Sequence, residues 1–185
     1  DRDYFLSLGL TLNKPLILVV MGSLGSTSVN AIMKDALPAV SERYQILFVT
    51  GKNNYEEMRK QIHAPHVKVV DYVKQLDIMA HVDLIVCRAG ATTAAEITAL
   101  GTPSILVPSP YVAHNHQFYN ASVLVDHKAA VMLEEKDLNA EALSNAIDRI
   151  MSDDLLRASM HSASLALGKP NASEDILNWC DEMKR

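Results

Sequence analysis

The amino-acid sequence predicts an α/β fold in which helices cover a doubly wound, parallel, six-stranded sheet of the Rossmann-like kind. Short apolar runs alternate with amphipathic stretches along most of the 185 residues, and this alternation is typical of strand–helix–strand crossovers. The apolar runs show little polar alternation, as expected of strands buried on both faces. Aromatic residues make up only 5% of the chain, which favours an aliphatic core.

The first three expected strands are rich in the β-branched and aliphatic residues that favour an extended backbone. They lie at 16–21, 45–50 and 67–70, and amphipathic stretches at 28–41, 54–62 and 75–81 follow them as helices. Ser26 or Ser28 is a suitable cap for the first of these helices, because its hydroxyl can accept a hydrogen bond from a free backbone N–H.

The other three expected strands lie at 83–87, 104–107 and 129–133, with helices at 92–100 and 116–127 between them. Gly101 is expected to end the earlier of these two helices. After the last strand the apolar spacing becomes purely helical. We expect Asn139 to cap a helix that ends near Met151, and Asp153 or Asp154 to start another.

Helices are also expected at both ends of the chain. Residues 1–12 are expected to form a helix that enters from an upstream segment, and Gly168-Lys169-Pro170 breaks the chain before a last helix at 172–184. Residues 1–185 are therefore expected to form one domain. Because the first strand begins only at residue 16, we expect this domain to be half of a larger protein.

Composition and short motifs exclude several classes of function. The net charge of −5 argues against nucleic acid as a partner, because such a surface needs a basic stripe. No apolar run approaches the roughly 20 residues of a membrane-spanning helix. Cys87 and Cys180 have no short metal or redox spacing, which favours a reducing, cytoplasmic compartment. Gly51-Lys52-Asn53 lacks the Ser or Thr of a phosphate-binding P-loop.

The most informative stretch runs from Cys87 to Glu96, where small residues join an expected strand to an expected helix. Such a turn leaves backbone N–H groups free at the helix N-terminus, where anions bind. Glu96 lies about one turn into the helix, where its carboxylate can accept hydrogen bonds from a ribose diol. The alternative is a solvated helix residue, but the small, apolar neighbours Ala95 and Ile97 favour the binding role.

A second turn, Met21-Gly22-Ser23-Leu24-Gly25-Ser26, follows the first expected strand. It lacks the Gly-x-Gly-x-x-Gly pattern of dinucleotide-binding proteins. Ser23 can donate its hydroxyl to a diphosphate, although the turn can equally be a plain tight turn. If the strands have the common order, the first and fourth flank the point where that order reverses, and both turns face one crevice. Arg88, which belongs to the turn before the helix at 92–100, can either bind a phosphate or pair with a nearby carboxylate.

The loop at 108–117 offers neutral hydrogen-bonding groups that suit the hydroxyls of a sugar. Its amide groups include Asn115 and Gln117, and Asn120 follows in the next helix; the alternative is an ordinary exposed polar loop. His114 and His116 are weak support for a metal site because no carboxylate lies nearby in the sequence. No metal and no cofactor is therefore expected.

Taken together, these motifs resemble those of the MurG family of peptidoglycan glycosyltransferases. The resemblance is carried by the segments Met21–Ser26, Tyr72-Val73, Cys87–Glu96, Ser109-Pro110-Tyr111 and Asn115-His116-Gln117 with Asn120. It covers nearly the whole chain and corresponds to the C-terminal, donor-binding half of a two-domain GT-B enzyme. The family commonly has Gly-Gly-Ser in the first turn, whereas Met21 replaces the first glycine here.

The resemblance implies a role for each matching residue in binding UDP-N-acetylglucosamine. Ser23 contacts the diphosphate, the backbone of Val73 faces uracil, and Glu96 binds the ribose. The loop that holds the nucleotide sugar consists of Ala91, Thr92, Thr93, Ala94, Ala95 and Glu96. Gln117 holds hydroxyls of N-acetylglucosamine, helped by Asn120. No catalytic base is assigned, because the family places the acceptor site in its N-terminal half.

The implied activity is inverting transfer of N-acetylglucosamine from the UDP-sugar to the lipid-linked muramyl-pentapeptide (lipid I), which gives lipid II in peptidoglycan synthesis. The lipid-linked acceptor is expected to bind through the N-terminal domain, against which the helix at 172–184 is expected to pack. The full-length protein is expected to be peripheral on the cytoplasmic face of the membrane. Alternatives are a separate donor-binding subunit that needs a partner chain, and a related UDP-sugar 2-epimerase or glycolipid synthase.

Overall fold

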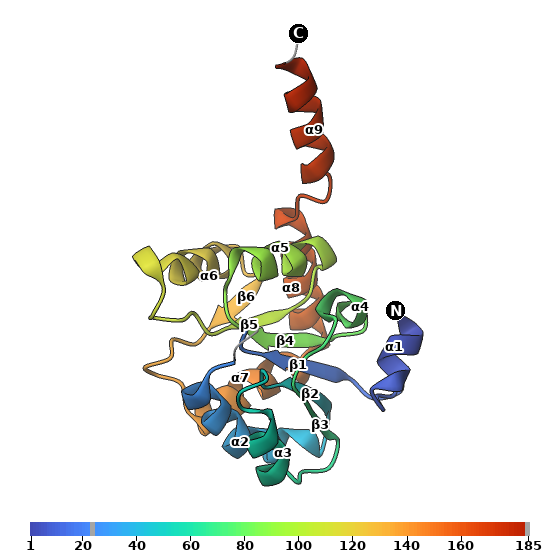
Figure 1. Ribbon diagram of the computed structural model, residues 1–185, viewed down its shortest axis with the longest axis vertical. Helices are drawn as coiled ribbons and strands as arrows, with labels where there is room; N and C mark the ends of the chain where they lie inside the picture. Colours follow the sequence, from blue (N-terminus) through green and yellow to red (C-terminus); the bar gives the residue numbers. More distant parts are fainter. Residues whose placement is uncertain (23–24, 184–185) are drawn as a thin grey trace.

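The computed structural model describes residues 1–22 and 25–183 of the chain. At its centre lies a six-stranded sheet in the order β3-β2-β1-β4-β5-β6, and all neighbouring strands pair in parallel (Figure 1). The strands are β1 (Leu16–Val20), β2 (Gln45–Val49), β3 (Val67–Val70), β4 (Leu84–Cys87), β5 (Ser104–Leu106) and β6 (Ala130–Met132). Each expected strand is present, and the predicted doubly wound fold is confirmed.

Helices cover both faces of the sheet (Figure 1). One face packs against α2 (Thr27–Ser41), α3 (Tyr55–Gln61) and α7 (Ala140–Met151). The other packs against α1 (Arg2–Ser7), α4 (Gln75–Met79), α5 (Ala91–Leu100) and α6 (His116–Asp126), the last preceded by the 3-10 turn η1 (Ala113–Asn115). This arrangement gives the three-layer architecture that the strand–helix alternation predicts.

The core is aliphatic and is divided by the sheet into two clusters. Along β1, Ile17 and Val19 belong to the cluster beneath α2 and α7, whereas Leu16, Leu18 and Val20 belong to the one beneath α4 and α5. All five side chains are buried. The central strand is thus buried on both faces, which explains why its sequence has no polar alternation.

Two of the expected caps at helix N-termini are confirmed and one is not, and Gly101 ends α5 as expected. The side-chain oxygen of Asn139 accepts a hydrogen bond from the backbone N–H of Ala142 at 2.9 Å, at the start of α7. Asp153 accepts one from Leu156 at 2.9 Å, at the start of α8 (Asp154–Leu167). Ser26 occupies the N-cap position of α2, but its hydroxyl makes no capping bond. It accepts a hydrogen bond from the Arg88 guanidinium instead, at 3.1 Å.

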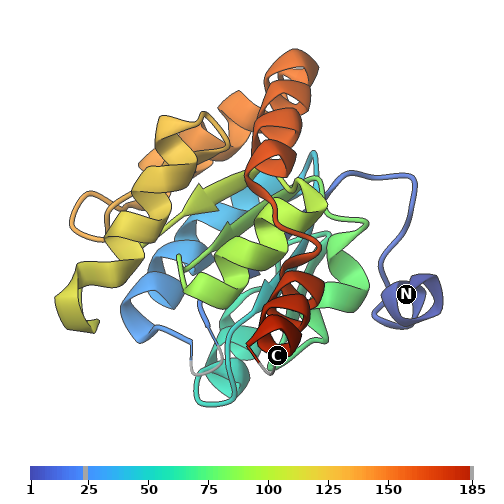
Figure 2. The same cartoon turned by 90° about the horizontal axis from the view of Figure 1, so that it is seen from above.

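The two terminal helices differ in how they meet the domain. α1 is shorter than expected, and its Phe5 is buried in the core cluster beneath α4 and α5. The last helix, α9 (Ala172–Glu182), extends away from the rest of the domain in Figure 1 and points toward the viewer in Figure 2. It contains no buried residue. Across the described part of the chain, no helix is long and apolar enough to cross a membrane.

Candidate functional site

Two adjoining cavities lie at the edge of the sheet where the strands end. The first has a volume of about 540 Å³ and is lined mainly by the segment Asp71–Asp77 and by α5. The second, of about 430 Å³, is lined by the turns after β1 and β4 and by the loop after β5. Among the described residues, four line both cavities: Val20, Gly22, Gln75 and Thr93. The two cavities therefore form one continuous cleft.

The strand order explains why the cleft lies at this point. β1 and β4 are neighbours in the sheet, but the chain leaves β1 toward α2 on one face and leaves β4 toward α5 on the other. Opposite departures open a crevice at the carboxyl ends of the two strands, where ligands of such folds bind. The described residues of the turn after β1, Met21, Gly22, Gly25 and Ser26, thus line the same cavity as the turn that precedes α5, as the sequence predicts.

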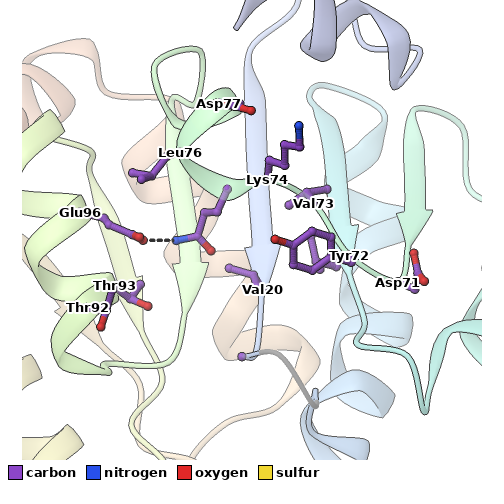
Figure 3. Close-up of a pocket in the computed structure, with 13 residues that line it drawn as sticks. Val20, Asp71, Tyr72, Val73, Lys74, Leu76, Asp77, Thr92, Thr93 and Glu96 are labelled. Atoms are coloured by element: carbon purple, nitrogen blue, oxygen red, sulfur yellow. Dashed lines mark hydrogen bonds between the residues drawn. The ribbon is translucent and has the colours of Figure 1, made fainter.

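In the first cavity, α5 faces the segment that follows β3. Figure 3 shows Glu96, Thr92 and Thr93 on one side and Val20 at the end of β1 near the middle. On the opposite side it shows Asp71, Tyr72, Val73 and Lys74. The side chain of Glu96 accepts a hydrogen bond of 2.7 Å from the Gln75 amide. Val73 is buried beneath the cavity, while the Tyr72 ring is 64% exposed at its rim.

The N-terminus of α5 lies where the two cavities meet. Gly90 is its N-cap, and neither a capping side chain nor an acidic residue occupies the first turn. Gly90 lines the second cavity and Thr93 lines both. Backbone N–H groups at such a helix end have no partner within the helix and carry a partial positive charge. This part of the cleft is thus suited to an anion such as a diphosphate.

Arg88 forms a nearly buried ion pair, which is the second of the two roles considered for it. Its guanidinium lies 2.8 Å from a carboxylate oxygen of Glu135, and the two side chains are 11% and 12% exposed. It also donates to the backbone carbonyl of Val107 at 3.1 Å. The other Glu135 oxygen accepts a hydrogen bond from Ser28 at 2.9 Å. Arg88 thereby ties the turn before α5 to the start of α2 and to the segment after β6.

Gln117 and Asn120 hold the loops that frame the second cavity. The side-chain oxygen of Gln117 accepts a hydrogen bond from the backbone N–H of Ser109 at 2.9 Å, and Gln117 lines the cavity. Asn120 donates to the carbonyl of Ala89 at 3.0 Å. Its amide therefore fixes the turn before α5, and Asn120 is not among the residues that line either cavity.

The structure brings five of the ten predicted residues to the cleft. Val73, Thr92, Thr93, Glu96 and Gln117 line it. The remaining residues of the predicted loop, Ala91, Ala94 and Ala95, belong to α5 but do not line either cavity. Ser23 lies outside the described residues. In the ranges 1–22 and 25–183, no group of three or more His, Cys, Asp or Glu side chains is arranged to hold a metal ion.

Sequence reasoning missed Gln75, Glu135 and the environment of Cys87. Gln75 is the first residue of α4 and belongs to the Asp71–Asp77 segment that follows β3. Its position soon after the end of a strand was the only sequence signal that linked it to the cleft. Cys87 ends β4 at the floor of the second cavity. Burial raises the pKa of the Cys87 thiol above its ordinary value of 9.0, and the negative charge of Glu96 raises it further. The thiol is therefore uncharged at neutral pH.

Residues 16–176 match the model of the glycosyltransferase family 28 C-terminal domain. The chain belongs to glycosyltransferase family 28. The match includes all six strands and every residue that lines the two cavities, so the whole cleft lies within the domain that defines the family.

Family 28 relatives of known sequence carry the name UDP-N-acetylglucosamine--N-acetylmuramyl-(pentapeptide) pyrophosphoryl-undecaprenol N-acetylglucosamine transferase. The protein of that name from Limosilactobacillus reuteri is 42% identical over 171 residues, which are 88% of this chain and 46% of that protein. The one from Bacillus cytotoxicus is 40% identical over 185 residues, or 97% of this chain and 51% of that protein. The chain thus spans about half the length of the curated relatives it matches.

Two solved structures resemble the chain. The crystal structure of Acinetobacter baumannii MurG has a TM-score of 0.84 and 25% identity, covering 97% of this chain and 53% of that one. The glycosyltransferase VinC, in complex with dTDP, has a TM-score of 0.72 at 17% identity, covering 95% of this chain and 44% of that one. The second likeness supports the fold alone. The predicted MurG resemblance and the C-terminal placement are confirmed.

Proposed function

We propose that the chain is the donor-binding half of an inverting transferase that moves N-acetylglucosamine from UDP-N-acetylglucosamine to a lipid-linked muramyl-pentapeptide. The observation that carries this proposal is the continuous cleft in which Glu96 faces the Asp71–Asp77 segment across the end of β1, beside the uncapped N-terminus of α5. The names of the relatives in two bacterial species support the choice of donor and acceptor.

The cleft suggests how an extended nucleotide sugar would lie. The uracil would occupy the first cavity beside the backbone of Val73, with Glu96 accepting hydrogen bonds from the ribose hydroxyls. The diphosphate would lie over the N-terminus of α5 and beside Gly22 and Gly25 of the turn after β1. The sugar would lie in the second cavity, where the amide nitrogen of Gln117 can donate to its hydroxyls. Asn120 would act through its hydrogen bond to Ala89.

The same arrangement would favour cleavage of the donor. Negative charge grows on the leaving UDP as the glycosidic bond breaks, and backbone N–H groups aimed at that charge stabilise the transition state. The N-terminus of α5 would supply such donors without rearrangement, because its first turn is already free of side-chain caps. Removing one well-aimed donor of this kind typically costs about 3–4 kcal/mol in the barrier. Glu96 and Gln117 would orient the substrate.

The acceptor and the membrane would involve the other half of the enzyme. The relatives' name includes a pyrophosphoryl-undecaprenol acceptor, and a lipid-linked acceptor favours peripheral association with the cytoplasmic face of the membrane. α9 would pack on that other half, because Ile176, Leu177 and Trp179 are each about 60% exposed. The domain alone would bind the donor and transfer nothing.

Calorimetric titration with UDP-N-acetylglucosamine and with GDP-mannose tests the proposal. The expected result is measurable binding of the uridine nucleotide sugar and much weaker binding of GDP-mannose, because the first cavity presents the backbone of a single short segment to the base. Equal binding of both, or binding of neither, would contradict the donor assignment.

The exposed face of α9 also supports a second arrangement, in which the chain is a separate donor-binding subunit that requires a partner chain. In that case the chain would elute with a partner in gel filtration, and the mixture would transfer N-acetylglucosamine. Elution at the mass of the chain alone in the presence of the candidate partner would argue against it.

A further inference from the structure

Gln75 connects the two walls of the cleft. It is the first residue of α4 and lines both cavities. Its side-chain nitrogen donates a 2.7 Å hydrogen bond to the carboxylate of Glu96, which belongs to α5, 21 residues later in the chain. The dashed line in Figure 3 marks this bond, and Glu96 points along it toward the segment that follows β3. This hydrogen bond thus joins the segment proposed to hold the base to α5, which carries the side chain proposed to bind the ribose.

We propose that Gln75 is a positioning residue, which holds the Glu96 carboxylate in the orientation that accepts the ribose hydroxyls. The inference rests on the proposed function and adds to it a residue that makes the ribose site rigid before the ligand arrives. Glu96 has three rotatable side-chain bonds and is partly exposed. Without a partner it would sample several rotamers, and binding would have to restrict them.

The chemistry of the pair suits this role. An ionised carboxylate offers about four lone-pair sites on two oxygens, and Gln75 contacts only one oxygen. The other oxygen therefore remains available to a diol. A Gln amide is neutral, so the full negative charge of Glu96 is retained, whereas a Lys or Arg would compete with the ribose as an ion-pair partner. No ion pair to Glu96 is found within residues 1–22 and 25–183.

The donor itself is held in place by its surroundings. Ile78 and Met79 of the same helix are buried in the core, and the Met79 sulfur lies 3.6 Å from the Gln75 amide nitrogen. The backbone N–H of Lys74, one residue earlier, donates to the hydroxyl of Tyr4 at 3.1 Å. The start of α4 is thus fixed on both sides, and a fixed donor can select one rotamer of Glu96.

The test compares UDP with 2′-deoxy-UDP, which lacks one of the two ribose hydroxyls, by calorimetry on the chain and on its Gln75→Leu variant. The wild-type chain is expected to prefer UDP. Gln75→Leu is expected to weaken UDP binding by about 3- to 10-fold, as for the loss of one hydrogen bond. The loss for 2′-deoxy-UDP is expected to be clearly smaller, because fewer hydroxyls depend on the orientation of Glu96.

Three further variants separate positioning from a general effect on folding. Gln61 makes a chemically similar hydrogen bond to Glu57 at 3.0 Å on the exposed surface of α3, so Gln61→Leu is a matched control that should leave both affinities unchanged. In the Glu96→Gln background, Gln75→Leu is expected to have little further effect, because the two residues act as a unit. If Gln75→Leu fails to fold, Gln75→Asn retains the amide, is too short to reach Glu96 and is expected to give the same pattern.

The possible outcomes separate this inference from the proposed function. If the chain prefers UDP but the Gln75 variants weaken both ligands equally, or neither, the positioning role is overturned and the donor site remains. An additive result in the Glu96→Gln background also overturns it. If the wild-type chain binds neither nucleotide, both the donor site and the role of Gln75 are overturned.

Discussion

At the scale of single residues, Glu96 is the side chain on which the proposed ribose site depends. Its position could be predicted from the sequence. A loop of small residues at the end of a strand leads into the helix, and a carboxylate in the early part of such a helix lies beside the cleft at the end of the sheet. Its hydrogen bond to Gln75 could not be predicted. That contact joins segments separated by another strand, and no local pattern records it.

We expect Glu96→Ala to weaken binding of UDP by roughly 10- to 100-fold, because hydrogen bonds to charged groups contribute about 1.5–3 kcal/mol. Calorimetry measures this change. Glu141→Ala, which removes an exposed carboxylate in the first turn of α7, should leave the affinity unchanged. An unchanged affinity in Glu96→Ala would remove Glu96 from the site.

Cys87 gives a prediction about reactivity. Because the thiol is buried and its pKa is raised, the reactive thiolate is scarce in the folded protein. A thiol reagent at pH 8 should therefore modify Cys180 first, which is only partly buried, and Cys87 only after unfolding. Counting modified thiols by mass spectrometry, before and after denaturant, measures this. Rapid modification of Cys87 in the folded chain would contradict the burial.

The same thiol makes stability depend on pH in a defined direction. The unfolded chain releases the Cys87 proton near pH 9, whereas the folded chain keeps it to a higher pH. The stabilisation is therefore complete below about pH 9 and declines as the pH rises, by up to about 1.4 kcal/mol per pH unit. Denaturant titrations of the wild type and Cys87→Ala between pH 8 and 10.5 should show the difference. If the free energies of unfolding of the two proteins change equally with pH, the prediction is contradicted.

At the scale of elements, the strands and most helices could be predicted because their signals are local. Caps such as Asn139 and Asp153 require only a side chain and a backbone N–H three residues later. Ser26 shows where this reasoning fails. Its hydroxyl, or that of Ser28, was expected to cap α2, but the guanidinium of Arg88, 62 residues away, donates a hydrogen bond to Ser26. The charged guanidinium, which is far away in the sequence, thus takes the place of the nearby backbone N–H of α2 as the donor to this hydroxyl.

The end of α5 should be sensitive to substitution. Gly101 has φ of +68°, and a Cβ atom there would lie 2.6 Å from Leu165 and 2.7 Å from the His161 ring. The His161 ring nitrogen also lies 2.7 Å from the Gly101 carbonyl oxygen. We expect Gly101→Ala to lower the free energy of unfolding by about 2–4 kcal/mol, from backbone strain and overpacking together, as measured by denaturant titration.

Gly9→Ala is the matched control for this substitution. Gly9 has a similar φ of +78°, but nothing lies within 4 Å of its Cβ position. It should therefore cost about 1 kcal/mol from the backbone alone. Equal losses in the two variants would show that the contact between α5 and α8 contributes nothing at this point.

At the scale of the whole molecule, the location of the cleft followed from topology. Once six strands and their crossovers were expected, the reversal of strand order placed the turns after β1 and β4 together. The division of the cleft into two cavities was not predictable. Gln75 of α4 and Thr93 of α5 line both cavities, and how side chains of different helices meet across a fold is not encoded in local spacing.

The exposed position of α9 predicts that it contributes little to the stability of the domain. Because α9 buries none of its residues, a chain that ends at Lys169 should unfold within about 1 kcal/mol of the full chain. Removing α8 as well should be severe, since Met160 is buried and Ser164 donates to the carbonyl of Ile97 at 3.2 Å. Thermal and denaturant melts of both truncations measure this. A large loss on removing α9 alone would contradict the structure.

The contacts of α1 with the residues on both sides of α4 have a consequence for the cleft. The Phe5 ring packs 5.0 Å from that of His81, just past the end of α4, and the Tyr4 hydroxyl accepts a hydrogen bond from the backbone of Lys74. α1 is thus anchored to the segment that lines one side of the first cavity. A shift of α1 would therefore move that side of the cavity and change its width.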